Sequence, residues 1–320
     1  MPPLPSRLRR PSPRTAVAAA AAVPLLALAA CGSSSEAAPA KPSGGTVRVV
    51  ASTNVYGDIA RTIGGAKVAV TSFISDPAQD PHSYEAGTRN RLALGRAQVV
   101  IENGGGYDDF MGTMLKASAS KAEVLDAVRI SGRTAPAGGE LNEHVWYDLP
   151  SMALLADRLS AALAKADPAA APAFTANATA FKAKLKDLEG KVAALKAAHS
   201  GDGVAVTEPV PLYLLEAAGL RNETPEEFSE AIEEGDDVAP RTMRETLGLF
   251  GGGNGAGKGG GKVKALVYNA QTSGPQTEQV EKAAKDDGVA VVPVTETLPS
   301  GRDYVTWMDG TIAALAKALS

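Results

Sequence analysis

The chain has 320 residues, of which 44% are hydrophobic, 5% aromatic and 21% charged, and its formal net charge is −4. This length and composition exclude a fibrous or wholly disordered protein and allow two ordinary domains. The first thirty residues hold four arginines and no acidic residue, so the rest of the chain carries 28 basic against 36 acidic residues, a net charge of −8. Because nucleic-acid binding usually needs a basic surface, this balance argues against a nucleic-acid partner.

The first thirty residues predict a secretory signal peptide. Residues 1–14 are basic and Pro-rich, and residues 16–30 form an apolar run that is short for a permanent membrane span. The run ends in Leu28-Ala29-Ala30-Cys31-Gly32, which resembles a bacterial lipobox, in which Cys31 is lipidated and becomes the new N-terminus. Cys31 is the only cysteine, which excludes an intrachain disulfide. Residues 32–45 are small, polar and rich in Pro and Gly, so we expect a flexible tether to the extracytoplasmic face of the cell membrane.

Short apolar strands and helices alternate after this tether. Strands are predicted at 46–52, 68–73 and 98–101. Helices are predicted at 56–64, at 88–96 with Thr88 as the N-cap, and at about 150–166. The alternation of strands with helices predicts parallel α/β layers.

The longest helical pattern follows Asp167-Pro168 and reaches about residue 199. Its apolar residues recur at helical spacing and predict one buried stripe: Phe174, Phe181, Leu185, Leu188, Val192 and Leu195. We expect its lysine-rich opposite face to be solvated. Further strands are then predicted at 203–207, 264–268 and 289–294, and further helices at 211–218, 240–249, 276–285 and 303–319.

We therefore predict an α/β protein with two Rossmann-like lobes, each a parallel sheet flanked by helices, joined by one long helix. The predicted parts are an N-terminal lobe at 46–167, the connecting helix at 168–199 and a C-terminal lobe at 200–320, in which residues 251–262 form a Gly-rich insertion. Since ligands of open α/β sheets bind beyond the carboxyl ends of the strands, the cleft between the lobes is the expected site.

Two histidines and two glutamates lie at positions suited to such a cleft. His82 follows the strand at 68–73, His144 precedes the helix at 150–166, and Glu208 and Glu296 come after strands of the second lobe. Imidazole and carboxylate groups are common ligands of divalent transition metals, so these four residues together predict a metal site. His199 ends the long helix, where a cationic side chain suits the helix dipole, and is predicted to be structural.

Two motifs resemble a known family. Asp80-Pro81-His82-Ser83-Tyr84-Glu85 is similar to the D-P-H-x-Y-E motif, and Glu143-His144-Val145-Trp146 in part to the P-H-x-W motif, of the solute-binding lipoproteins of zinc and manganese ABC importers (cluster A-I). The similarity covers nearly the whole mature chain and implies a rigid connecting helix. It also implies a metal shell of His82, His144, Glu208 and Glu296. Glu208 takes the place of a third ligand that is His in typical zinc-type members and Glu in manganese-type members.

Several features depart from the family pattern. Glu296 replaces the usual Asp, Pro is absent before His144, and the acidic, His-rich loop of zinc-type members is missing. An acidic run at 233–237 could recruit cations weakly, but a solvated loop is the favoured interpretation. Residues 252–258 fit G-x-x-x-x-G-K, but Gly259 replaces the Ser or Thr of a phosphate-binding loop and no strand precedes it, so coincidence is predicted.

The resemblance implies that the protein is not an enzyme. It would bind one zinc or manganese ion and deliver it, as a monomer, to the permease and ATPase of an ABC importer. One alternative is a secreted metallohydrolase that uses the same site, and another is an adhesin-like surface lipoprotein with incidental metal. Four protein ligands would close the shell, whereas catalytic zinc keeps a position open for water. Two carboxylates and no third imidazole favour manganese slightly, although intrinsic affinity favours zinc.

Overall fold

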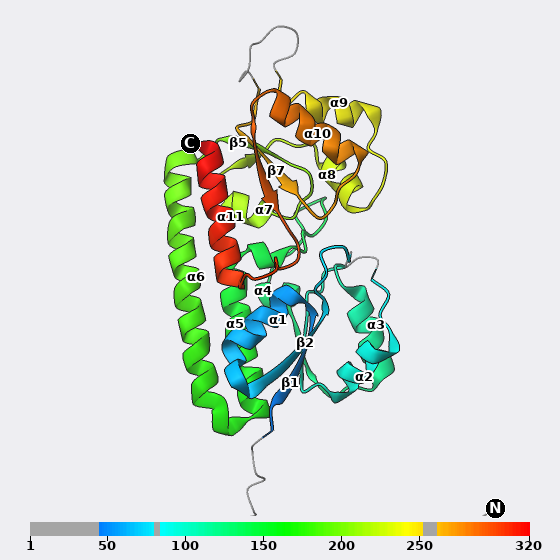
Figure 1. Cartoon of the computed structure of the whole chain (residues 1–320), viewed down its shortest axis with the longest axis vertical. Helices are drawn as coiled ribbons and strands as arrows, with labels where there is room; N and C mark the ends of the chain where they lie inside the picture. Colours follow the sequence, from blue (N-terminus) through cyan, green and yellow to red (C-terminus); the bar gives the residue numbers. More distant parts are fainter. Residues whose placement is uncertain (1–44, 80–83, 252–260) are drawn as a thin grey trace, which may run out of the picture. The chain divides into compact units, whose positions relative to one another are not determined.

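The computed structural model describes residues 45–79, 84–251 and 261–320. Within them the first sheet has four parallel strands in the order β2-β1-β3-β4 (Figure 1). Its strands are β1 (Val47–Thr53), β2 (Val68–Ile74), β3 (Val99–Glu102) and β4 (Glu123–Asp126). Its apolar residues form two layers of core, one on each face of the sheet.

Helices cover both faces of the first sheet. They are α1 (Asn54–Gly64), α2 (Thr88–Arg96), α3 (Asp109–Ser118), α4 (Ala127–Ser131) and α5 (Leu149–Ala166), with short 3-10 turns η1 (Gly65–Lys67), η2 (Val145–Tyr147) and η3 (Pro168–Ala170). Buried residues of α1 and α5 pack on one face, and those of α2 and α3 on the other. The carboxyl ends of β1, β3 and β4 therefore open at one edge of this layered lobe.

The second sheet repeats this architecture with the order β6-β5-β7-β8, again all parallel. Its strands are β5 (Gly203–Val206), β6 (Arg221–Asn222), β7 (Ala265–Asn269) and β8 (Ala290–Val294). Its helices are α7 (Leu212–Ala217), α8 (Glu226–Glu233), α9 (Pro240–Leu247), α10 (Pro275–Asp286) and α11 (Tyr304–Leu319). Apolar residues of α8 and α10 pack on one face, whereas those of α7 and α11 pack on the other.

The long helix α6 (Ala171–His199) runs beside helices of both lobes (Figure 1). The stripe predicted from its spacing is buried throughout, from Phe174 to Leu195. Near the middle, the Phe181 ring packs against Tyr304 of α11, with ring centroids 5.9 Å apart. One continuous apolar core therefore joins both sheets through α6.

Hydrogen bonds also tie the two lobes directly. The Asn54 side chain at the start of α1 donates to the Leu298 carbonyl at 2.9 Å and accepts from the Leu298 N–H at 2.8 Å. The buried Tyr304 hydroxyl donates to the Trp146 carbonyl at 2.6 Å. These bonds and the shared core oppose a hinge motion of one lobe against the other.

The predicted fold class is confirmed, and most predicted strands and helices lie within two residues of their observed bounds. Thr88 as the N-cap is wrong: Gly87, whose backbone is extended, precedes the first helical residue, and Thr88 already lies inside α2. The elements α3, β4, α4, β6 and α8 were not predicted, because these segments are too short to show a clear repeat of apolar residues. No helix in the described ranges is long and apolar enough to cross a bilayer.

Candidate metal centre

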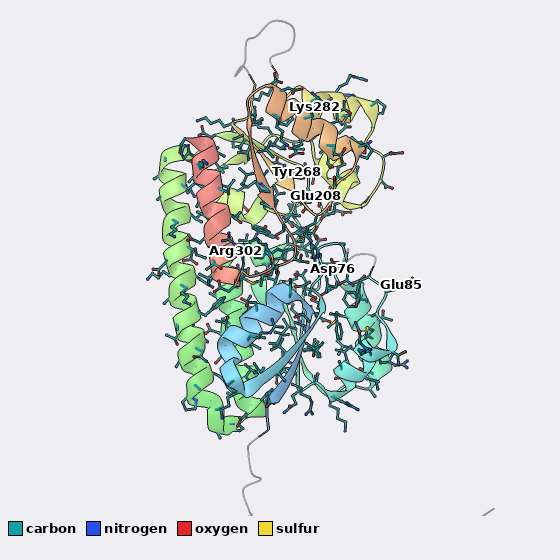
Figure 2. All side chains as sticks on the ribbon, viewed as in Figure 1. Asp76, Glu85, Glu208, Tyr268, Lys282 and Arg302 are labelled. Carbon is teal, nitrogen blue, oxygen red and sulfur yellow. The ribbon has the colours of Figure 1, made fainter. Side chains whose placement is uncertain are left out.

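The structure places three of the four predicted ligands where the lobes meet. His144 precedes η2 and is 1% exposed, Glu208 follows β5 and is 3% exposed, and Glu296 follows β8 and is 8% exposed. Figure 2 shows Glu208 at the end of the second sheet nearer the first. His82 and Cys31 lie outside the described residues.

The two buried acids of the second lobe share one hydrogen-bond donor. Asn269, the last residue of β7, donates from Nδ2 to Glu208 Oε2 at 2.6 Å and to Glu296 Oε1 at 2.9 Å. Asn269 is 1% exposed, and its own backbone N–H donates to the Thr207 hydroxyl at 2.9 Å. A buried carboxylate needs such donors, so Asn269 fixes where both acids lie.

Tyr107 of the first lobe forms a hydrogen bond with Glu296 of the second. The Tyr107 hydroxyl donates to Glu296 Oε2 at 3.2 Å, and its ring lies edge-on to His144 with centroids 5.8 Å apart. Burial, followed by the charge of Glu296, raises the pKa of the Tyr107 phenol well above its ordinary value, so the hydroxyl keeps its proton and remains a donor.

A glycine turn brings Tyr107 to this position. Gly104, Gly105 and Gly106 follow β3 with φ values of 75°, 71° and 103°, a region that other residues rarely adopt. A Cβ atom on Gly104 would also lie 2.6 Å from Asp126 Oδ1. The turn therefore requires glycine at position 104. Tyr107 is the next residue after the three glycines, so the turn sets its position.

Asn142 orients the imidazole of His144. The His144 backbone N–H donates to Asn142 Oδ1 at 3.0 Å, and His144 Nδ1 lies 2.7 Å from the same oxygen. Asn142 Nδ2 donates to the Pro209 carbonyl at 3.1 Å, which identifies Oδ1 as the acceptor. In the neutral ring the proton is therefore on Nδ1, and Nε2 presents a lone pair suitable for a metal.

Two further carboxylates reach the same imidazole. Ligand atoms of Glu143, His144 and Glu233 all lie within 4.8 Å of one another, an arrangement that could hold a metal ion. Glu233 Oε1 at the end of α8 lies 3.4 Å from His144 Nε2. Burial, followed by the charges of Glu143, Glu208 and Glu296, raises the pKa of Glu233 to about 9.

The prediction of a solvated acidic run is therefore wrong for Glu233 and correct for its neighbours. The Glu233 side chain is only 17% exposed because α8 turns it towards His144. Glu234, Asp236 and Asp237 are exposed. His199, at the end of α6, lies 3.1 Å from Asp202 Oδ2, a local contact consistent with a structural role.

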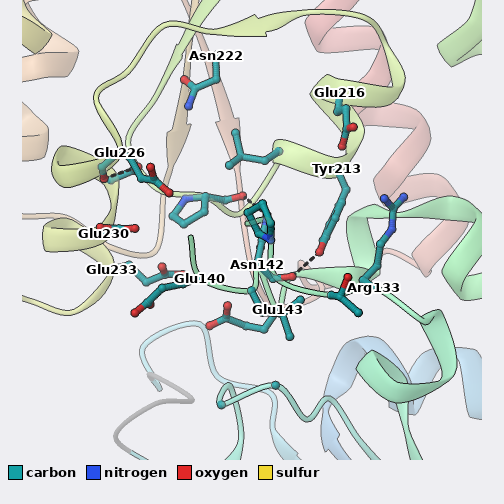
Figure 3. Close-up of a pocket in the computed structure, with 18 of the residues that line it drawn as sticks. Arg133, Glu140, Asn142, Glu143, Tyr213, Glu216, Asn222, Glu226, Glu230 and Glu233 are labelled. Atoms are coloured by element: carbon teal, nitrogen blue, oxygen red, sulfur yellow. Dashed lines mark hydrogen bonds between the residues drawn. The ribbon is translucent and has the colours of Figure 1, made fainter. Parts of the chain in front are cut away.

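A cavity of about 1220 Å³ opens beside this cluster. Figure 3 shows Glu140, Glu226, Glu230 and Glu233 gathered on one side of it. Glu143, Glu216 and Glu234 line it as well, and Arg133 is the single basic side chain among the described lining residues. Arg133 is itself paired with Asp148 at 2.8 Å, so the cavity presents a negative potential that attracts cations.

Sequence reasoning missed Asn142, Glu143, Asn269 and Glu233 as parts of the site. Asn269 is the last residue of a strand, and Glu208 lies two residues after one, so the position of Asn269 at a strand end could have indicated it. Glu143 could have been indicated by its position next to the predicted ligand His144. Nothing in the local sequence of Asn142 or Glu233 distinguishes them from ordinary surface polar residues.

Most of the chain matches a known protein family. The family model described as "Zinc-uptake complex component A periplasmic" (ZnuA) matches residues 49–318. The chain belongs to this family. This membership agrees with the family resemblance of the two histidine motifs.

A curated relative aligns with part of the chain. The manganese-binding lipoprotein MntA of Bacillus subtilis (strain 168) is 32% identical over 182 residues, which cover 55% of this chain and 58% of the relative. The chain thus spans somewhat more than half the length of this relative.

Solved structures share the fold along most of the chain. The periplasmic zinc-binding protein TroA of Treponema pallidum superposes with a TM-score of 0.69 at 18% identity, covering 86% of this chain and 100% of TroA. The solute-binding protein FpvC of Pseudomonas aeruginosa, in complex with Mn²⁺, gives a TM-score of 0.68 at 22% identity, covering 85% of this chain and 98% of FpvC. Both show that the ZnuA-family chain has the two-lobed fold of these binding proteins.

The role of Asn269 yields a first prediction. Asn269→Asp replaces the shared donor with a third carboxylate between Glu208 and Glu296, so it should lower the free energy of unfolding of the chelator-treated protein by about 2 kcal/mol or more. Urea unfolding near pH 8 measures this change. Asn269→Ala, which removes the donor without adding a charge, should destabilise the protein less, and an Asn269→Asp variant as stable as the wild type would contradict the assigned role.

Proposed function

We propose that this chain captures a divalent transition-metal ion, zinc or manganese, outside the cytoplasm and delivers it to the permease of an ABC importer. One observation carries the proposal: ligand atoms of the buried His144 imidazole, of Glu143 in the first lobe and of Glu233 in the second lie within 4.8 Å of one another, an arrangement that could hold a metal ion. Membership of the zinc-uptake component A family supports the same function.

The proposed ligands are His82, His144, Glu208 and Glu296. His144 offers Nε2, because Asn142 holds its other ring nitrogen. Glu208 and Glu296 both accept a hydrogen bond from Asn269 Nδ2, which holds the two carboxylates beside one amide. Two neutral imidazoles and two carboxylates compensate the charge of a 2+ ion, and these donors suit zinc or manganese.

The acidic cavity supports capture of a free cation. Among the described residues, seven glutamates line it, and its arginine is neutralised by Asp148. A concave, low-dielectric surface of one sign raises the local concentration of the opposite charge. Hydrated divalent cations are therefore concentrated beside the proposed ligands, whereas anionic solutes are repelled.

The proposed activity is binding and release without catalysis. Protein donors from both lobes would fill the coordination shell, whereas a catalytic metal keeps a position for water. The manganese-binding name of the Bacillus subtilis relative agrees with such a role. We further propose that the protein acts as a monomer, is anchored through a lipid on Cys31, and partners the permease and ATPase of its importer.

The function can be tested by metal titration. Chelator-competition titrations should give one Zn(II) or Mn(II) ion bound per wild-type chain. His82→Ala, His144→Ala and Glu208→Ala should each weaken binding by about tenfold or more, because each removes a donor. His199→Ala is the matched control, since this histidine pairs with Asp202 at the end of α6, and its affinity should equal that of the wild type.

Two outcomes would contradict the proposed function. If the wild-type chain binds neither ion more tightly than a generic acidic surface, metal capture is wrong. If binding is tight but Glu208→Ala retains full affinity, Glu208 is not a ligand and the set of proposed donors must change.

Release is expected to involve local movement rather than lobe opening. The shared core along α6 and bonds such as Tyr304 to Trp146 should keep the two sheets protected with and without metal. Hydrogen–deuterium exchange should therefore show metal-dependent protection confined to the loops and short helices around the site. Deprotection of α6 and both sheets on metal removal would show a hinge instead.

The anchor can be tested in cells. Cys31→Ser should abolish incorporation of labelled fatty acid and release the protein from the membrane fraction, while a Ser33→Ala control two residues away should remain anchored. Labelling of the Cys31→Ser protein would exclude this cysteine as the lipidated residue.

A further inference from the structure

Glu233 contacts the imidazole atom that is suited to bind the metal. Glu233 Oε1 lies 3.4 Å from His144 Nε2, and the two side chains are 17% and 1% exposed. Glu233 ends α8 in the second lobe, whereas His144 belongs to the first, so the contact joins residues 89 positions apart. Neither the predicted set of four ligands nor the family resemblance includes Glu233.

Hydrogen-bond roles make this contact unusual. Asn142 Oδ1 accepts from the His144 backbone and lies 2.7 Å from Nδ1, so the neutral ring carries its proton on Nδ1. Nε2 then presents a lone pair towards Glu233 Oε1, a buried oxygen that has no hydrogen-bond partner among the described residues. Two acceptors that face each other in a buried site repel, and either a proton on the Glu233 carboxyl or a positive ion between the two atoms removes that repulsion.

The separation of the two atoms fits a shared ion. Zinc-like ions lie about 2.1 Å from nitrogen and oxygen ligands, and a tetrahedral angle between two such bonds separates the ligand atoms by about 3.4 Å. Nε2 and Oε1 already stand at that distance. An ion could therefore bind both atoms without a change in their separation.

We propose that Glu233 is itself a ligand of the captured ion, together with His144, and that it shifts the preference of the site from zinc towards manganese. This inference rests on the proposed function. Four donors complete the tetrahedral shell that zinc adopts, so a fifth adds little to zinc binding. Manganese takes more ligands and favours carboxylate oxygen, so it gains more from Glu233.

Competition titrations of Glu233→Gln and Glu233→Ala with Mn(II) and Zn(II) test the proposal. Both variants should bind Mn(II) about tenfold more weakly or worse, and Zn(II) no more than about threefold more weakly. The visible spectrum of bound Co(II) supplies a second readout, because its bands intensify as coordination falls towards four. Both variants should show stronger bands than the wild type.

Glu227→Gln is the matched control. Glu227 lies on the same helix, is exposed and does not line the cavity. The Glu227→Gln substitution removes the same charge as Glu233→Gln, so the affinities of this variant for Mn(II) and Zn(II) should equal those of the wild type. Thermal unfolding of the metal-free variants checks that each is folded.

The outcomes separate this inference from the function on which it rests. If the wild type binds tightly but the Glu233 variants bind equally well, bind more tightly, or lose the same factor for both ions, the ligand role in selectivity is wrong and the function stands. If the wild type binds neither ion, the proposed function itself fails.

Discussion

Buried acids need hydrogen-bond donors at fixed positions, and two asparagine amides meet this requirement at the centre of the molecule. Asn269 serves both Glu208 and Glu296 from the end of β7. Asn142 holds His144 while its own amide donates to Pro209 in the other lobe. Each amide therefore sets the geometry of groups that would otherwise repel or rotate, and the arrangement of the candidate metal centre depends on them more than on any single carboxylate.

The amides hold this geometry only because the frame around them is stiff. The buried stripe of α6 joins both lobes in one core, and Asn54, Tyr304 and Tyr147 add hydrogen bonds between lobes that do not involve the site. A cleft framed in this way brings imidazole and carboxylate groups together before an ion arrives. The mobile part of a binding cycle must then be small, and α8, a helix of eight residues that carries Glu233, is a short element in contact with the imidazole.

The sequence predicted those features that repeat or that follow from strand topology. The 3.6-residue period from Phe174 to Leu195 predicted α6, and a residue just after a parallel strand must lie at the carboxyl edge of its sheet, which located Glu208 and Glu296. The contact of Glu233 with His144 could not be predicted, because it depends on how α8 packs against its sheet. Asn142 was equally hidden, since its role comes from contacts with Pro209 and Tyr213 that no local pattern encodes.

The same electrostatics that attract a cation also explain how it can leave. Glu143 and Glu233 approach one buried imidazole, and the charges of Glu208 and Glu296 act on Glu233. The repulsion among these carboxylates in a poorly solvated site is relieved most fully by a divalent ion. Binding of the ion relieves this repulsion, and because the stiff frame already holds the ligands together, no free energy is spent on assembling them. Release requires only that one donor withdraw and admit water to the remaining carboxylates. A ligand on a short helix can do so while the amide-held pair, Glu208 and Glu296, stays in place, so a rigid two-lobed frame remains compatible with transfer of the ion to a partner.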